Sequence, residues 1–142
     1  MTPATPPPAP LLIGCAAGFS GDRIDAAGPV VQELIRQQHP AVLIFETLAE
    51  RTLALAQLAR RSNPEAGFEP LMPEFLRPVL ADCLQHGIRI VSNFGAANPP
   101  AAARAIQRLA QELGIRAPRI AVVHGDDLSA PAHRPLLTAA LD

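Results

Sequence analysis

The sequence predicts an α/β protein, with a parallel sheet of about four strands and helices on both faces of the sheet. Short apolar runs recur along the chain, and a helical pattern separates each run from the next. Apolar strands that alternate with helices are typical of right-handed crossovers and a parallel sheet. A Rossmann-like, doubly wound sheet is the first choice. Half of a β/α barrel has the same local pattern and is the alternative.

The strands are predicted from four continuous apolar runs, because strands covered on both faces lack polar alternation. The runs lie near residues 11–15, 41–46, 88–92 and 119–123. Their shared character predicts that the sheet is wholly parallel.

Helical spacing marks the connections between these runs. Two helices are indicated by apolar residues on one face: Ala27, Val30, Val31 and Leu34 in the first, and Ile106, Leu109, Ala110 and Leu113 in the last. Between them, Thr47 and Glu50 have capping-box spacing ahead of a helix that is apolar nearly all round from Leu53 to Ala59. Such a helix is usually covered on more than one side. If it is left exposed, it favours association into a dimer or larger assembly.

A single α/β domain is expected over residues 11–128. Five of the 16 prolines lie in residues 1–10, which predicts a disordered leader, and residues 129–142 are weakly patterned. The net charge of −1 gives no basic field for nucleic acid or an anionic membrane. All 12 basic residues are Arg, which excludes chemistry that needs a lysine from this chain. No run approaches the roughly 20 apolar residues of a membrane span.

The two cysteines, Cys15 and Cys83, lie far apart in sequence and form no metal or redox motif. We expect them to be reduced, mostly buried and unjoined, as in a cytoplasmic protein.

Small and polar residues gather where each predicted strand ends. Loops at the carboxyl ends of parallel strands share one edge of the sheet, where α/β proteins bind ligands. Loop by loop, these residues are Gly18, Ser20, Gly21, Asp22 and Arg23; Glu46; Asn93, Gly95 and Asn98; and His124, Gly125, Asp126 and Asp127. The pattern predicts a ligand site at this edge, with Arg51 close by.

Asp22, Glu46 and Asp126 are the candidate catalytic acids, bases or metal ligands, and Asn93 is the candidate group that polarises a substrate carbonyl. The other residues of the four loops, with Arg51, are candidate ligand-binding residues. Structural roles compete at each position, since glycines permit tight turns and Asp22 or Asn98 can cap a helix.

Three familiar kinds of site are weakly supported: a dinucleotide-binding loop, a catalytic triad and a metal site. The glycine loop reads G-x-x-x-G-x-x-G, which is not the dinucleotide fingerprint. Ser20, His124 and Asp126 could be assembled as a triad, but no G-x-S-x-G elbow supports it. The sequence leaves both the cofactor and the metal unknown.

Four segments, in this order, carry a family resemblance: "GFSGDRID", "FETLAERTLALAQLAR", "GIRIVSNFGAANP" and "IAVVHGDD". Over Ile13 to Asp127 the chain resembles the acyclic terpene utilisation A (AtuA-type) family, long catalogued as a domain of unknown function. Members are usually much longer, so the resemblance implies a fragment of that architecture.

The resemblance implies bacterial catabolism of acyclic terpenoids, such as citronellol and geraniol, or of related branched-chain acyl-CoA compounds. A lyase or hydratase reaction is the preferred expectation. A non-catalytic domain that binds acyl-CoA or a partner subunit is the alternative. The expected partners are a small-molecule substrate and a second copy or partner subunit, without nucleic acid or membrane.

Overall fold

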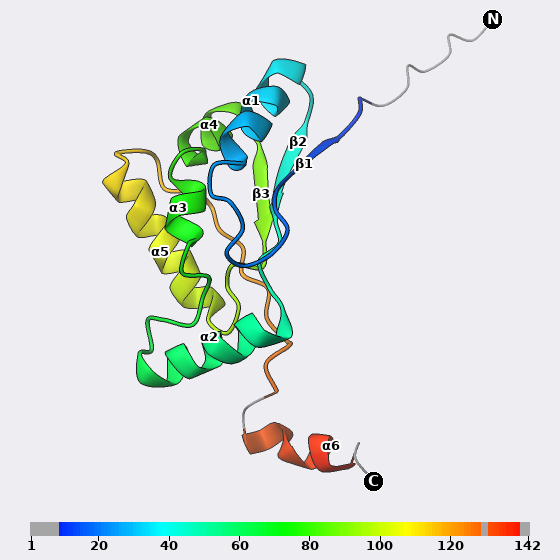
Figure 1. Ribbon diagram of the computed structural model, residues 1–142, viewed down its shortest axis with the longest axis vertical. Helices are drawn as coiled ribbons and strands as arrows, with labels where there is room; N and C mark the ends of the chain where they lie inside the picture. The colour runs from blue at the N-terminus through cyan, green and yellow to red at the C-terminus, as the bar shows by residue number, and fades with distance from the viewer. Residues whose placement is uncertain (1–8, 129–130, 140–142) are drawn as a thin grey trace, which may run out of the picture.

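The computed structural model describes residues 9–128 and 131–139 (Figure 1). Its sheet has three strands, β1 (Leu12–Ala17), β2 (Ala41–Phe45) and β3 (Arg89–Ser92), in the order β1-β2-β3. Both neighbouring pairs are parallel, and the register sets Leu43 beside Gly14 and Ile90. The predicted parallel α/β architecture is therefore confirmed. The predicted leader falls mostly on residues outside the described ranges.

Six α-helices are present in the described part of the chain. They are α1 (Ala27–Gln37), α2 (Glu50–Ser62), α3 (Met72–Leu76), α4 (Leu80–His86), α5 (Pro99–Glu112) and α6 (Arg134–Ala139), with the short 3₁₀ helix η1 (Pro131–His133) directly before α6. In Figure 1, α6 lies beyond α2 and away from the sheet. No helix in the described ranges has the length and apolar character needed to cross a membrane.

The helices cover one face of the sheet, and the prediction that they cover both faces is not confirmed. Helix α1 packs on β1, α4 packs on β3, and α5 packs against α3 on the same side (Figure 1). Strands that follow one another in chain order have no reversal of direction across the sheet, so right-handed crossovers all fall on one side. This one-sided, sequential order is the one expected of half a β/α barrel, and the doubly wound arrangement is not seen.

The predicted fourth strand is also absent. Residues 119–123 run past β3 but do not pair with it, and Val123 is 87% exposed. These residues are apolar, but apolar composition alone does not make a strand, which must also approach its neighbour to about 4.8 Å. Here a groove separates the two segments.

The core lies between the sheet and the helices on its covered face. Phe45, Phe75 and Phe94 form a fully buried aromatic cluster, with ring centroids 5.0–5.8 Å apart. Gly14 lets α1 approach β1 closely, because a Cβ there would lie 2.5 Å from Cγ1 of Val30. The amphipathic faces predicted for α1 and α5 are among the residues that form this core.

Helix α2 differs from the prediction in its cap and in its exposure. Ala49 is the N-cap residue, and its amide donates to the Thr52 hydroxyl, so Thr47 and Glu50 do not form the predicted capping box. No residue of α2 is buried, and Leu55 and Leu58 are each more than half exposed. The expected cover on more than one side is therefore missing from the described residues.

Candidate functional site

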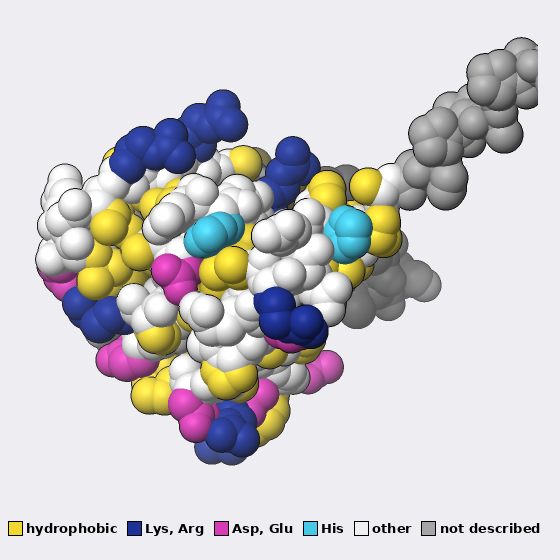
Figure 2. Space-filling model, turned by 90° about the horizontal axis from the view of Figure 1, so that it is seen from above, with side chains coloured by type: hydrophobic (Ala, Val, Ile, Leu, Met, Phe, Trp, Pro, Cys, Tyr) yellow, Lys and Arg dark blue, Asp and Glu magenta, His cyan; other side chains and the backbone are white. Residues whose placement is uncertain are grey.

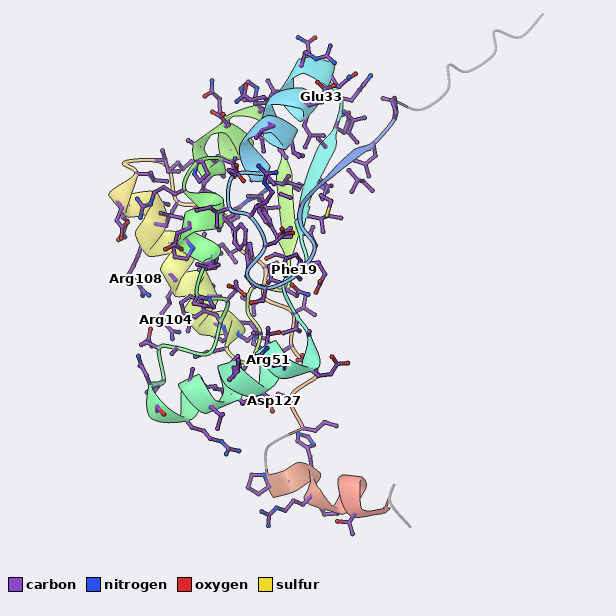
Figure 3. The ribbon with its side chains drawn as sticks, in the orientation of Figure 1. Phe19, Glu33, Arg51, Arg104, Arg108 and Asp127 are labelled. Carbon is purple, nitrogen blue, oxygen red and sulfur yellow. The ribbon has the colours of Figure 1, made fainter. Side chains whose placement is uncertain are left out.

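The four predicted loops do lie at one edge of the sheet, beyond the carboxyl ends of the strands. Figure 3 shows Phe19 on the glycine loop, Arg51 at the start of α2 and Asp127 on the last loop toward this end of the molecule. The edge is divided among three groups of side chains.

The glycine loop is held by Asp22. Its carboxylate accepts hydrogen bonds from the Gly18 amide (2.9 Å) and from the Arg23 amide (2.7 Å), and these bonds hold the pKa of Asp22 below its ordinary value. Gly21 has φ of +87°, a left-handed conformation that explains a glycine there. Helix α1 begins five residues later with Ala26 as its N-cap, so Asp22 closes the loop and does not cap the helix.

The charged neighbours of Asp22 do not pair with it. Arg23 makes a two-pronged ion pair with Asp25, at 2.6 and 2.7 Å. In the described ranges, no hydrogen bond joins Asp22 to Glu46 or Asp126, and no group of three His, Cys, Asp or Glu side chains could hold a metal ion. The three acids considered as a hard-cation site are therefore not brought together.

Ser20 instead meets a buried carboxylate that the sequence did not indicate. Its hydroxyl donates to Glu69 at 2.7 Å, and the second Glu69 oxygen accepts from the Leu71 amide at 3.1 Å. Glu69 is only 4% exposed, and its own amide donates to the Phe94 carbonyl. A charged group this buried needs such partners. The hydroxyl of Ser20 thus donates to Glu69, and not to the His124 of the weakly supported triad.

The second group joins β2 to β3 through Asn93. Its Oδ1 accepts from the Thr47 amide at 2.8 Å and from the Thr47 hydroxyl at 3.3 Å, while its Nδ2 donates to Glu46 at 2.8 Å. Glu46 also accepts from the Leu48 amide, and these bonds lower its pKa. Two of the four predicted catalytic residues are thus in contact. Thr47, which was taken as a helix cap, is a buried member of this group.

Asn98 and Gly95 have structural roles. Asn98 is buried, caps α5 through the Ala101 amide, and donates to the carbonyls of Pro64 and Ala66 at 2.8 and 2.7 Å. A Cβ on Gly95 would lie 2.8 Å from Pro99, which opens α5. These contacts fix the turn that carries Asn93 toward α5.

The third group surrounds a cleft of about 540 Å³ between α2, the start of α5 and the last loop. His124, Gly125, Asp126 and Asp127 all line it. Arg60, which the sequence analysis did not single out, donates to the Ala97 carbonyl at 2.6 Å and to Asp127 at 3.3 Å. Arg60 therefore ties the last loop to the loop before α5.

A larger hollow, which we call the β3 groove, joins this edge of the molecule to the opposite one. It lies between β3, the apolar sides of α4 and α5, and residues 116–126, and its volume is about 1340 Å³. Its walls include Leu80, Leu84, Ile90 and Ile106. Asn93, His124 and Asp126 also line it, so these members of the predicted site form the polar mouth of an apolar groove, and the residues of the glycine loop do not line it.

Comparison with protein-family models shows which family the chain belongs to. The family model described as "Acyclic terpene utilisation family protein AtuA" matches residues 11–140. The chain belongs to the AtuA family. The resemblance read from the four segments is therefore confirmed, and it extends beyond Asp127. AtuA proteins are named for acyclic terpene utilisation, which supports a role in terpenoid catabolism. Searches of curated proteins and of solved structures gave no significant match.

Proposed function

We propose that the chain binds an acyclic terpenoid or a related branched-chain acyl compound, with its apolar chain in the β3 groove and its reacting end at the carboxyl edge. One observation carries the proposal: the apolar groove opens at Asn93, His124 and Asp126. Ligand sites are typically apolar hollows with a few convergent polar groups. The family's link to acyclic terpenes supports an apolar, chain-like ligand.

The preferred chemistry is that of a lyase or hydratase acting on an acyl-CoA thioester. Such a reaction needs a group to polarise the carbonyl, a base to take a proton and an acid to return one. Asn93 donates one Nδ2 proton to Glu46 and keeps a second for a carbonyl oxygen. Glu46 is the proposed base; its hydrogen bonds with Asn93 and the Leu48 amide lower its pKa, which keeps it ionised but makes it a weak base. Asp126, at the mouth, is the proposed second residue of the proton transfer, and His124 is a proposed ligand-binding residue.

Asp22 is the weakest of the proposed catalytic residues, because both of its oxygens hold the glycine loop. We assign it the positioning of Ser20, whose hydroxyl donates to Glu69. Asp22→Asn keeps the shape of the side chain but only one accepting oxygen. It therefore removes the charge together with one of the two hydrogen bonds that hold the loop.

Filling the groove tests the binding proposal. Ala103 lines the β3 groove on α5, whereas Gln107 is exposed on the same helix and does not line it. Ala103→Trp should weaken citronellol binding at least about tenfold, because displacing even two methylenes from an apolar wall costs about 1.6 kcal/mol. Gln107→Trp should bind as the wild type does. Calorimetric titration is the measurement, and equal binding by both variants would overturn the proposal.

The catalytic step has its own test. An unsaturated branched acyl-CoA thioester is incubated with the protein, and mass spectrometry detects the gain of water. Asp126→Asn should bind the thioester but form no hydrated product, and exposed Glu50→Gln is the matched control. Binding without any product in the wild type would favour the alternative, a non-catalytic acyl-CoA-binding domain.

An interaction role is favoured by a separate observation. Leu53, Leu55 and Leu58 project from α2 with 37–58% of their surfaces exposed. Exposed apolar side chains grouped on one helix promote association. We propose that α2 contacts a second copy or a partner subunit. Leu55→Glu with Leu58→Glu should convert an assembly to a monomer in light scattering, and a wild-type monomer would remove the proposal.

A further inference from the structure

The arginines divide into two groups by their partners. Six of them, Arg23, Arg36, Arg60, Arg77, Arg104 and Arg108, lie within 4.0 Å of a carboxylate. No ion pair within the described ranges involves the other six, Arg51, Arg61, Arg89, Arg116, Arg119 and Arg134. Three of these six, Arg89, Arg116 and Arg119, line the β3 groove. The arginines that line the groove are thus all without a carboxylate partner in the described ranges.

The three arginines belong to the end of the groove opposite the polar mouth. Arg89 is the first residue of β3, and Arg116 and Arg119 lie on the segment that leaves α5 and enters the far wall. Figure 2 looks onto this end of the molecule and shows basic side chains at several places on it, some of them beside apolar ones. Among the described residues that line the groove, Asp126 is the one acid, and it lies at the other end.

Three like charges around an apolar hollow create a positive potential that an anion relieves. Guanidinium groups recognise carboxylate and phosphate through paired hydrogen bonds, so their natural complement is an anionic oxygen cluster. The apolar walls between the arginines and the mouth exclude a ligand that is polar throughout. Charge at one end and apolar surface beyond it together define an amphipathic ligand.

We infer that Arg89, Arg116 and Arg119 form an anion site for the far end of the ligand, whose acyclic chain lies along the β3 groove. The inference rests on the proposed function of the groove and adds the ligand's class: an apolar chain with a carboxylate or phosphate remote from its reacting carbon. From Arg89 to Asn93 the strand rises by about 13 Å, at about 3.3 Å per residue. The chain between the anion and the reacting group spans this distance.

Three probes with the same ten-carbon chain test the inference: decanol, decanoate and decyl phosphate. Calorimetric titration at low salt should show both anions binding at least about fivefold more tightly than decanol. This modest gain is expected because each ion pair between an exposed arginine and an anion contributes little. The stronger of the two anions identifies the preferred head group. Added salt should weaken anion binding and leave decanol binding nearly unchanged.

Matched variants locate the effect. Arg116→Gln with Arg119→Gln should remove the preference for anions and leave decanol binding intact. Arg61→Gln is the control, because Arg61 is exposed, lies on α2 and is not part of the groove. Equal binding of all three probes, or an anion preference that survives in the double variant, would overturn the anion site while the groove proposal stands. Binding of no probe, as expected if residues 119–123 close onto β3, would overturn both.

Discussion

The two faces of the sheet have similar composition and opposite surroundings. On the covered face, Leu43 and Phe45 are inaccessible and pack under the helices. On the other face, Ile13 is 64% exposed and Val91 is 57% exposed, and Cys15, two residues after Ile13 on β1, is also exposed. Parallel sheets are normally covered on both faces. The described residues leave this apolar face uncovered, so we expect another part of the family architecture or a second copy of the chain to cover it.

The comparison also explains where the functional features lie. Strands in chain order send every crossover to one side, so the helices stabilise one face and leave the other face and the outer edge of β3 open. The β3 groove lies at that edge. The asymmetry of the sheet and the position of the proposed ligand are thus two results of the same topology.

The sharpest contrast is expected in thiol reactivity. Cys15 lies on the open face, whereas burial raises the pKa of Cys83 to about 11. At pH 8 a thiol with that pKa is ionised in roughly one molecule in a thousand, and the thiolate is the nucleophile. Iodoacetamide should label Cys15 in the native protein and Cys83 only after denaturation, as peptide mass mapping would show. Protection of Cys15 would mean that a second copy covers the face.

The next largest effect is expected in the free energy of unfolding. Leu43→Ala should cost about 2–5 kcal/mol, as truncations in a well-packed core do. Ile13→Ala, one strand away on the open face, should cost less than about 1 kcal/mol, because most of its surface is already in water. Urea denaturation measures both. Similar losses for the two variants would show that the open face is covered.

Close packing at Gly14 gives an intermediate effect. An alanine Cβ would lie 2.5 Å from Val30 Cγ1 and 3.1 Å from Leu34 Cδ1, so α1 must shift from β1. Gly14→Ala should destabilise the fold by about 1–3 kcal/mol. Gly28→Ala is the control, because a Cβ there meets nothing within 4 Å. Thermal unfolding compares them, and a neutral Gly14→Ala would contradict the tight approach.

The smallest effect concerns acid. Hydrogen bonds lower the folded-state pKa of Asp22 and Glu46 below their ordinary values. Each group therefore adds stability above its unfolded pKa, roughly 4, and that stability is lost as the pH falls through the folded pKa. Asp22→Asn and Glu46→Gln should each flatten the decline in melting temperature below about pH 4. An unchanged acid slope in both variants would show that these bonds do not form in solution.

The sequence predicted those features that depend on local pattern. Continuous apolar runs identified three strands, and helical spacing identified the core faces of α1 and α5. The fourth run failed because an apolar composition does not ensure pairing with a neighbouring strand. The capping box at Thr47 failed because Asn93, 46 residues away, offers Thr47 a better partner.

For the candidate site, the sequence predicted the edge of the sheet at which the loops lie but not the contacts between their side chains. Parallel topology places every strand exit at one edge, so the loops could be assigned without coordinates. Glu69 was missed because it lies in an irregular segment and meets Ser20 across 49 residues. The arginines of the groove carry no local signal either, since only the fold shows which of them have acidic partners.

Amide chemical-shift mapping with citronellol tests the central claim, that the β3 groove is the ligand site. Chemical-shift changes are predicted for the amides of residues 88–95 and 119–126, which lie on both walls of the groove and at its mouth. The amides of β1 should be unaffected. Changes confined to β1 or to α2, or an absence of changes at saturating ligand, would contradict the account.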